Sequence, residues 1–528
     1  MTRGQSVWAV AIIFGLLIIF CVNSAWALTG FARKYQTTCI TCHEAPPRLN
    51  KDGEAFRING YRFIDDETKV KQEPFELGDE AYQRLWPQAI WPGKAPKYSP
   101  LSILTTWNLE YHNDPQPDPI TGLDLPEISF VMPHEIELAW ADSLGEHMSF
   151  YGDIRFIQED YGGDDLASWG MLKGWIQFED LFGLENKLNL QLGSVGMHTI
   201  GLFNARNEMG MPFQPYLMNG VRMPSLQKLD YTGNYSVEDV YVYTGNTFVI
   251  QNQTGIEVNG FTRHLYYYGG IVNGKIKNPA GSEPEDSLFF LGAGSNSDTK
   301  DFYAGLNLKI GGLGFDGTTG NEVEVGLQTE GTDGSLQPSG NSQFWRDNSL
   351  IISLFGYQGE GRVTIERWED ITDKSKATGY SVDYYEDDFR RFGVGLLQRY
   401  NDFTISAGYM WGENDNPYGD LSNNKVKTES WFIESHYFVY PWLVPFVRYE
   451  GVDFNGLPST APDDPDPDLD EELLVLDGEE DRAILTVGAK IQIRPNVLLN
   501  IEGYYYTEDA DFNYALDKSV FAILRAGF

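Results

Sequence analysis

Apolar and polar residues alternate in short runs from residue 101 to the end of the chain. In one run Trp107, Leu109 and Tyr111 alternate with polar neighbours, and another run begins at Leu485. Successive side chains of a β-strand point to opposite faces, so a period of two indicates strands with one apolar and one polar face. Because these runs recur over most of the chain, they constrain the fold more than any other feature and predict an all-β structure.

The connections between the runs are of two kinds. Short connections centre on Gly145, Asn401, Pro441 and Pro495, and long polar connections cover residues 197–235, 274–300, 331–346, 371–387 and 453–481. Short turns at one end and long loops at the other are typical of outer-membrane β-barrels, whose strands have about ten residues. The pattern predicts a transmembrane barrel of about 16 to 18 antiparallel strands over residues 101–528. A soluble β-sandwich or propeller is the alternative.

The last strand supports the barrel. The chain ends on Phe528, at the end of an alternating row, and a terminal strand ending in Phe resembles the signal by which outer-membrane barrels are recognised for insertion. Several charges fall on rows assigned to the inner face: Glu110, Asp153, Arg155, Glu434, Arg448, Glu450, Lys490, Glu502 and Arg525. A charged lumen is ordinary in porins, and we assign no catalytic role to these residues.

Composition excludes two other classes of protein. An all-α membrane protein needs several apolar runs of about 20 residues, whereas the mean hydropathy here is -0.34 and residues 7–22 form the only long apolar run. The formal charge is -37, from 39 Lys plus Arg against 76 Asp plus Glu. Nucleic acid is therefore excluded as a partner, because phosphate binding needs clustered basic residues. The chain also lacks phosphate-binding loops and nucleophile elbows, which argues against a hydrolase or transferase.

The N-terminus has the features of an export signal. Arg3 precedes the apolar run, and Ala25-Trp26-Ala27 follows it. A basic start, an apolar core and small residues at the cleavage site define a secretory signal peptide. We therefore expect residues 1–27 to be removed. An uncleaved anchor is the alternative, although the run is short for a spanning helix.

Cys39, Cys42 and His43 form a C-x-x-C-H motif, the arrangement for covalent attachment of c-type haem. The two thiols add to the two vinyl groups of one haem, and the histidine brings an imidazole to the iron. A redox disulfide or half a zinc site is the alternative. No cysteine follows the motif, however, and the next histidine is His112, so no ligands nearby could complete a zinc site. We expect one haem c, attached through Cys39 and Cys42, with His43 as the proximal ligand.

Residues 28–100 are predicted to form a small α-helical monohaem cytochrome c module. Basic residues outnumber acidic ones over residues 28–62, in contrast to the rest of the chain, and could pair with the haem propionates. The module lacks a Met or second His for the sixth coordination position of the iron. Either that position is open or water-filled, or a later residue fills it, with His112, Met132 and His134 the nearest candidates in sequence.

The N-terminal region resembles a known family. Phe31-Ala32-Arg33-Lys34-Tyr35, the C-x-x-C-H motif, Pro47-Arg48-Leu49-Asn50, Gly53 and Phe56-Arg57-Ile58-Asn59-Gly60-Tyr61 are similar to the N-terminal module of fused monohaem c-type cytochrome-porins of the outer membrane. These proteins are best known from iron-oxidising bacteria. The resemblance implies that electrons pass from extracellular Fe(II) to periplasmic carriers, and it carries over Cys39, Cys42 and His43 as the haem-binding residues.

Together these features predict electron transfer across the bacterial outer membrane. A covalent one-electron cofactor in or at a barrel surrounded by outer-membrane lipid would carry electrons from Fe(II) or another extracellular reductant to a periplasmic electron carrier, with the module in the periplasm or inside the lumen. One alternative is a solute porin whose haem plugs the lumen, acts as a sensor or helps the N-terminus to fold. Another is a haem enzyme that uses an open sixth position.

Overall fold

The computed structural model describes the barrel strands and part of the N-terminal region. The residues that it describes are 29–35, 37, 41–45, 48–63, 75–76, 94–95, 101–112, 128–143, 147–158, 167–195, 225–230, 238–244, 253–273, 300–318, 327–328, 337–338, 345–369, 379–419, 424–458, 472–477, 482–494, 497–506 and 518–527. The predicted signal peptide, Cys39 and Phe528 lie outside these residues.

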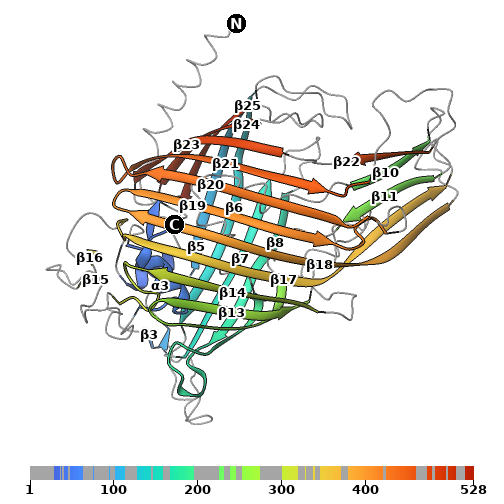
Figure 1. Cartoon of the computed structure of the whole chain (residues 1–528). Coiled ribbons are helices and arrows are strands. Elements are labelled where there is room, and N and C mark those ends of the chain that lie inside the picture. Colours follow the sequence, from blue (N-terminus) through green and yellow to red (C-terminus); the bar gives the residue numbers. More distant parts are fainter. Residues whose placement is uncertain are drawn as a thin grey trace, which may run out of the picture.

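The strands form a closed antiparallel barrel (Figure 1). The described strands include one 19-stranded sheet, in which β10, β11 and β22 are accessory strands and the other 16 form a ring. The ring closes where β9 pairs with β12 and where β25 pairs with β5. In ring order its members are β5 (Leu101–His112), β6 (Ile128–Ser143), β7 (Met148–Gln158), β8 (Ala167–Phe178), β9 (Asn189–Val195), β12 (Gln253–Phe261), β13 (Leu265–Val272), β14 (Asp301–Ile310), β17 (Ser349–Glu369), β18 (Gly379–Tyr400), β19 (Phe403–Asn414), β20 (Val426–Tyr437), β21 (Leu443–Asn455), β23 (Arg482–Arg494), β24 (Val497–Tyr506) and β25 (Lys518–Gly527). The ring confirms the lower end of the predicted strand number.

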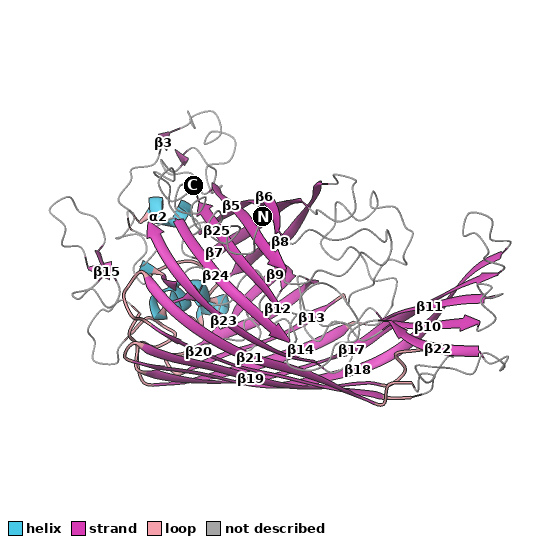
Figure 2. Ribbon diagram, turned by 90° about the horizontal axis from the view of Figure 1, so that it is seen from above, coloured by secondary structure: helices cyan, strands magenta, loops and turns pink. Residues whose placement is uncertain are grey.

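The three accessory strands extend the wall beyond one end of the ring (Figure 2). They are β10 (Ser225–Asp230), β11 (Glu238–Thr244) and β22 (Glu472–Asp477). Strand β10 pairs with β11 and β22, and β11 pairs with the last residues of β17. Two small hairpin pairs lie outside this sheet: β3 (Phe75–Glu76) with β4 (Lys94–Ala95), and β15 (Leu327–Gln328) with β16 (Gln337–Pro338).

The connections segregate to the two ends of the barrel, as predicted. The four predicted short turns all join strands at one end, which we call the short-turn mouth, and stretches 197–235, 274–300 and 453–481 all fall between ring strands at the other end. The first and last of these stretches are not loops throughout, because they contain the accessory strands β10 and β22. Two other predicted loops were wrong. Much of 371–387 belongs to β18, and 331–346 lies at the short-turn mouth between β14 and β17. Its polar composition indicates a loop, but only the direction of the preceding strand decides at which end that loop lies.

The two faces of the wall differ as the alternation predicts. In β20, Ile433 is 50% exposed on the outside, whereas the adjacent Glu434 is 1% exposed on the inside. Most of the charges predicted to face inward are buried: Asp153, Glu434, Arg448, Glu450, Lys490 and Glu502. Exposed aromatic residues gather on the outside near the short-turn mouth: Tyr400, Phe403, Tyr437, Tyr440 and Trp442. An apolar belt bordered by aromatic residues is how such a barrel meets a bilayer.

The described part of the N-terminal region consists of short elements seated among the strand ends of the short-turn mouth, where the helices are blue in Figure 1. They are α2 (Thr29–Lys34), β1 (His43–Ala45), β2 (Arg48–Leu49) and α3 (Lys51–Ile58). Asn50 caps α3 because its side chain accepts a hydrogen bond from the backbone N–H of Gly53. The predicted helical module is thus described only in part, and its identity as a cytochrome stays a prediction.

None of the helices in the described ranges is long and apolar enough to cross a membrane.

Candidate functional site

Residues 29–63 are attached to the inside of the barrel at the short-turn mouth. Gly30 donates its backbone N–H to Ser102 Oγ at 3.0 Å, near the start of β5. Lys34 Nζ lies 2.9 Å from Asp142 Oδ1, near the end of β6, and Arg62 pairs with a carboxylate just after the end of β8. These partners all belong to one arc of the ring, from β5 to β8.

A cluster of buried charges fixes helix α3 to the opposite part of the wall. Glu54 Oε1 lies 2.6 Å from Arg399 Nη2, and Lys309 Nζ lies 3.0 Å from Asp347 Oδ2 and 3.8 Å from Glu54 Oε2. Burial alone would raise the pKa of Glu54, but Arg399 and Lys309 outweigh it and hold that pKa below its usual value. Glu54 is therefore an ionised anchor of α3 at neutral pH.

A second series of ion pairs connects the residues that follow the motif with the barrel wall. Arg48 Nε lies 2.5 Å from Glu44 Oε1, and Arg48 Nη1 lies 3.2 Å from Glu434 Oε1 on β20. Glu434 also faces Arg448 at 3.5 Å, and Arg448 pairs with Glu450 at 3.0 Å. Glu44 follows His43 directly, so this series begins beside the proposed proximal ligand.

Aromatic side chains form a separate cluster in the segment and reach the wall. Phe31 and Phe56 meet edge to face, with ring centroids 5.0 Å apart. Tyr61 stacks at 6.0 Å on Tyr151 of β7 and at 5.8 Å on Trp175 of β8. Such rings provide the apolar surface that would cover a haem macrocycle and exclude water.

The structure describes two of the three predicted motif residues. Cys42 and His43 are half-buried, and His43 begins the β1–β2 pair, where it lies opposite Leu49. The backbone N–H of Asn50 donates to Cys42 O at 2.9 Å. Helix α3 also passes close to the motif at Gly53, where a Cβ atom would overlap the carbonyl oxygen of Cys42. The fold of this loop therefore depends on a glycine that faces the motif.

We expect Gly53→Ala to destabilise the packing of the motif segment. An unhindered helical Gly→Ala change is favourable by about 0.5–1 kcal/mol, but overlap with backbone costs about 1–3 kcal/mol. Limited proteolysis of the folded barrel should therefore cleave the N-terminal segment faster in this variant. Equal or slower cleavage than in the unsubstituted protein would show that α3 adjusts without disturbing the motif.

Several buried groups beside the motif have polar atoms to which no described residue gives a hydrogen bond. They include Nη2 of Arg48 and both ring nitrogens of His436. Buried polar groups are almost always satisfied, so unpaired ones indicate a place where another group completes the bonding. A basic side chain suits a propionate and an imidazole suits iron, so the residues here fit a haem. The described residues contain no cluster of three His, Cys, Asp or Glu side chains that could hold a bare metal ion.

The structure does not bring the three candidate sixth ligands to the motif. His112 lies ten residues along β5 from Ser102, and Met132 and His134 lie eight to ten residues along β6 from Asp142. At about 3.3 Å per residue these positions are about 26–33 Å from the mouth along their strands. Met132 also lies on the outer face and is 42% exposed. Sequence reasoning missed His436, although it shares the inward row of Glu434, two residues earlier.

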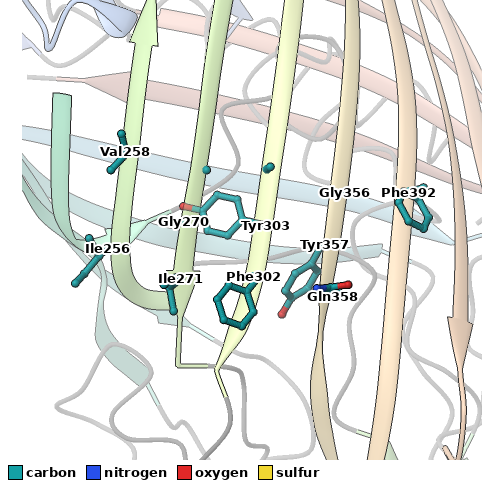
Figure 3. A pocket seen from close by; sticks show the side chains of 12 residues that line it. Ile256, Val258, Gly270, Ile271, Phe302, Tyr303, Gly356, Tyr357, Gln358 and Phe392 are labelled. Carbon is teal, nitrogen blue, oxygen red and sulfur yellow. The ribbon is translucent and has the colours of Figure 1, made fainter. Parts of the chain in front are cut away.

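A groove on the outer face is separate from this site (Figure 3). It has a volume of about 580 Å³ and is lined by apolar residues of which Ile256, Ile271, Phe302 and Phe392 are exposed. Gly269, Ala304 and Gly356 pair with one another across neighbouring strands and form its floor. Its lining suits the hydrocarbon of a bilayer, and it shares no residue with the N-terminal segment.

The closed antiparallel ring, the apolar outer face and the polar inner face make this chain a porin-like β-barrel of the bacterial outer membrane. No protein-family model matches the chain, and no curated protein matches it. Among solved structures it is similar to the outer membrane channel DcaP of Acinetobacter baumannii, with 9% identity and a TM-score of 0.42 over 81% of this chain and 96% of that one. It is also similar to the trimer form of OmpT of Vibrio cholerae (9% identity, TM-score 0.44, 81% and 98%) and to an anion-selective porin from Comamonas acidovorans (9%, 0.43, 81% and 98%).

Proposed function

We propose that this barrel transfers electrons across the outer membrane through one haem c, attached at Cys39 and Cys42 with His43 as its proximal ligand. The donor is extracellular Fe(II) or another reductant, and the acceptor is a periplasmic carrier. The observation that carries the proposal is the position of Cys42 and His43 in a segment that buried ion pairs fix inside the short-turn mouth. A group attached there is held by the barrel.

The position of the segment suits a conduit. Short turns of outer-membrane barrels face the periplasm, so a haem in this mouth is accessible to a periplasmic carrier. The hydrocarbon layer is about 30 Å thick, and electron transfer slows steeply with distance. A redox centre enclosed by the wall shortens the path that remains to the outside.

The residues of the segment would hold and shield the group. Haem c supplies reversible one-electron chemistry at its iron when bound. The cluster around Phe31, Phe56 and Tyr61 excludes water, and Arg48 offers a buried cation to a propionate. The pairs Glu54–Arg399 and Lys34–Asp142 keep the segment in place while electrons pass.

A solute porin with a plugging N-terminus is the second candidate. It is favoured by the ring itself, since 16-stranded barrels enclose an aqueous channel. The inner face also carries uncharged polar side chains of the kind that line solute channels, including Asn259, Asn307 and Ser353.

The two candidates differ in what crosses a vesicle membrane. We would reconstitute the full mature protein in vesicles that enclose ferricytochrome c and add ferrous citrate outside. We expect the enclosed cytochrome to be reduced with the unsubstituted protein but not with a Cys39→Ala/Cys42→Ala control. A second set of vesicles, enclosing a coloured ferrous chelator, reports leakage of iron.

Reduction of the enclosed cytochrome c, with no colour in the vesicles that enclose the chelator, supports electron transfer. The electron-transfer proposal is contradicted if the Cys39→Ala/Cys42→Ala control reduces the enclosed cytochrome c equally, or if the chelator colours as fast as the cytochrome is reduced. Either result supports the solute porin. Absence of a covalent c-type haem spectrum in the purified protein also contradicts the proposal.

A further inference from the structure

We propose that His436, on barrel strand β20, supplies the sixth ligand to the haem iron, so that the barrel wall completes the coordination begun by His43. This inference rests on the proposed function, because it requires haem at the C-x-x-C-H motif.

His436 lies close to the segment that carries the motif. It is the second-last residue of β20, at the short-turn mouth, and is 2% exposed. Its Nε2 lies 3.9 Å from Oε1 of Glu44, the residue that follows His43. The side chain therefore points inward, toward the segment that carries the motif.

The imidazole ring of His436 has unused hydrogen-bonding capacity. No described residue forms a hydrogen bond with its Nδ1 or Nε2, and 3.9 Å is too long for a hydrogen bond to Glu44. A buried donor or acceptor without a partner destabilises a fold. Coordination to iron would satisfy one nitrogen and explain why a polar ring is kept in this position. The ring of Phe438 packs edge-on against it at 5.7 Å.

The other described histidines beyond the motif are less suitably placed than His436. The chain has seven. His112 and His134 lie far along their strands from the mouth. His147 and His264 are near the mouth but exposed, and His264 Nδ1 lies 3.1 Å from the backbone oxygen of Lys309. Among the histidines that the structure describes beyond the motif, His436 alone is both buried and beside the segment.

This arrangement has a structural consequence. One ligand would come from the N-terminal segment and the other from the wall, so the iron would tie the segment to the barrel in addition to the ion pairs of Arg48 and Glu54. A segment that left the mouth would lose its sixth ligand. The redox potential would therefore report whether the segment is docked.

The test uses absorption and EPR spectra of the full-length protein in detergent. The unsubstituted protein should contain a six-coordinate, low-spin haem that does not bind CO rapidly when reduced. His436→Ala should give a high-spin haem that binds CO, and added imidazole should restore the low-spin spectrum. His436→Met should stay six-coordinate with a raised potential, because a thioether ligand favours the reduced iron.

His264→Ala is the matched control, because it removes another histidine at the same mouth and should leave the spectrum unchanged. Heat-modified migration on gels verifies that each barrel is folded. A low-spin spectrum that is unchanged in both His436 variants overturns the inference, as does a five-coordinate haem in the unsubstituted protein. These results differ from failure of the proposed function, in which the unsubstituted protein carries no covalent haem or passes no electrons.

Discussion

Glu54→Ala should release helix α3 from the barrel wall and increase the ionic conductance of the channel. Glu54 is 1% exposed and is the partner of Arg399 at 2.6 Å, with Lys309 at 3.8 Å. Removing one partner of a buried pair costs up to about 3–5 kcal/mol, and here it leaves Arg399 with only two described carboxylate partners, Glu44 and Asp347, each at 4.0 Å. The substitution destabilises the docked state only, because Arg399 becomes hydrated once α3 leaves the mouth.

Single-channel recording in planar bilayers measures this effect. Arg390→Ala is the matched control: Arg390 lies on the same strand, but its side chain is 53% exposed and its ion pair with Glu413 spans 3.4 Å at the surface. Loss of such a surface pair costs about 0–1 kcal/mol and should leave conductance unchanged. Equal conductance of the Glu54→Ala and Arg390→Ala channels would mean that the buried cluster does not hold the segment in the mouth.

Ile433→Arg should strongly destabilise the barrel in a membrane. Ile433 is 50% exposed on the outer face of β20, several residues from the aromatic border at Tyr437. A lipid-facing arginine costs about 2–4 kcal/mol near the middle of the bilayer and much less near its borders. Denaturant unfolding in lipid vesicles gives the free energy of unfolding directly.

Two further variants test whether contact of the charge with hydrocarbon causes the destabilisation. Ile433→Leu keeps the outer face apolar and should change the unfolding free energy little, and Tyr437→Arg, at the border, should cost about 0–1 kcal/mol. If Ile433→Arg were no more costly than Tyr437→Arg, the outer face at Ile433 would not be in hydrocarbon.

The barrel strands could be predicted because their signal is local. In β20 the apolar Ile433 and the charged Glu434 point to opposite sides whatever the rest of the chain does, since the β backbone alternates its side chains. Short turns such as the one at Asn401 are equally local, because two strands meet there directly. The strand number was not fixed by such signals, because residues 236–262 hold both an accessory strand and a ring strand with similar patterns.

Only the C-x-x-C-H motif of the candidate site could be predicted from the sequence. Cys39, Cys42 and His43 are recognisable because covalent haem attachment requires this spacing of thiols and imidazole. For a sixth ligand, proximity in sequence favours His112, Met132 and His134. Closure of the ring instead brings β20, nearly 400 residues away, beside the motif: Glu44 and His436 are 392 positions apart in sequence but 3.9 Å apart in space.

By itself, the sequence determined the local properties of this protein: strands with two unlike faces, an inner row of charges, the positions of most turns and a C-x-x-C-H motif. Only the tertiary structure decided that the ring has 16 strands, that residues 331–346 lie at the short-turn mouth, and that Arg399, Glu434 and His436 of the wall face the segment that follows the motif. The physical reason is that side-chain alternation depends on the backbone of one strand, whereas these contacts depend on how many strands close the ring and in which direction each one runs.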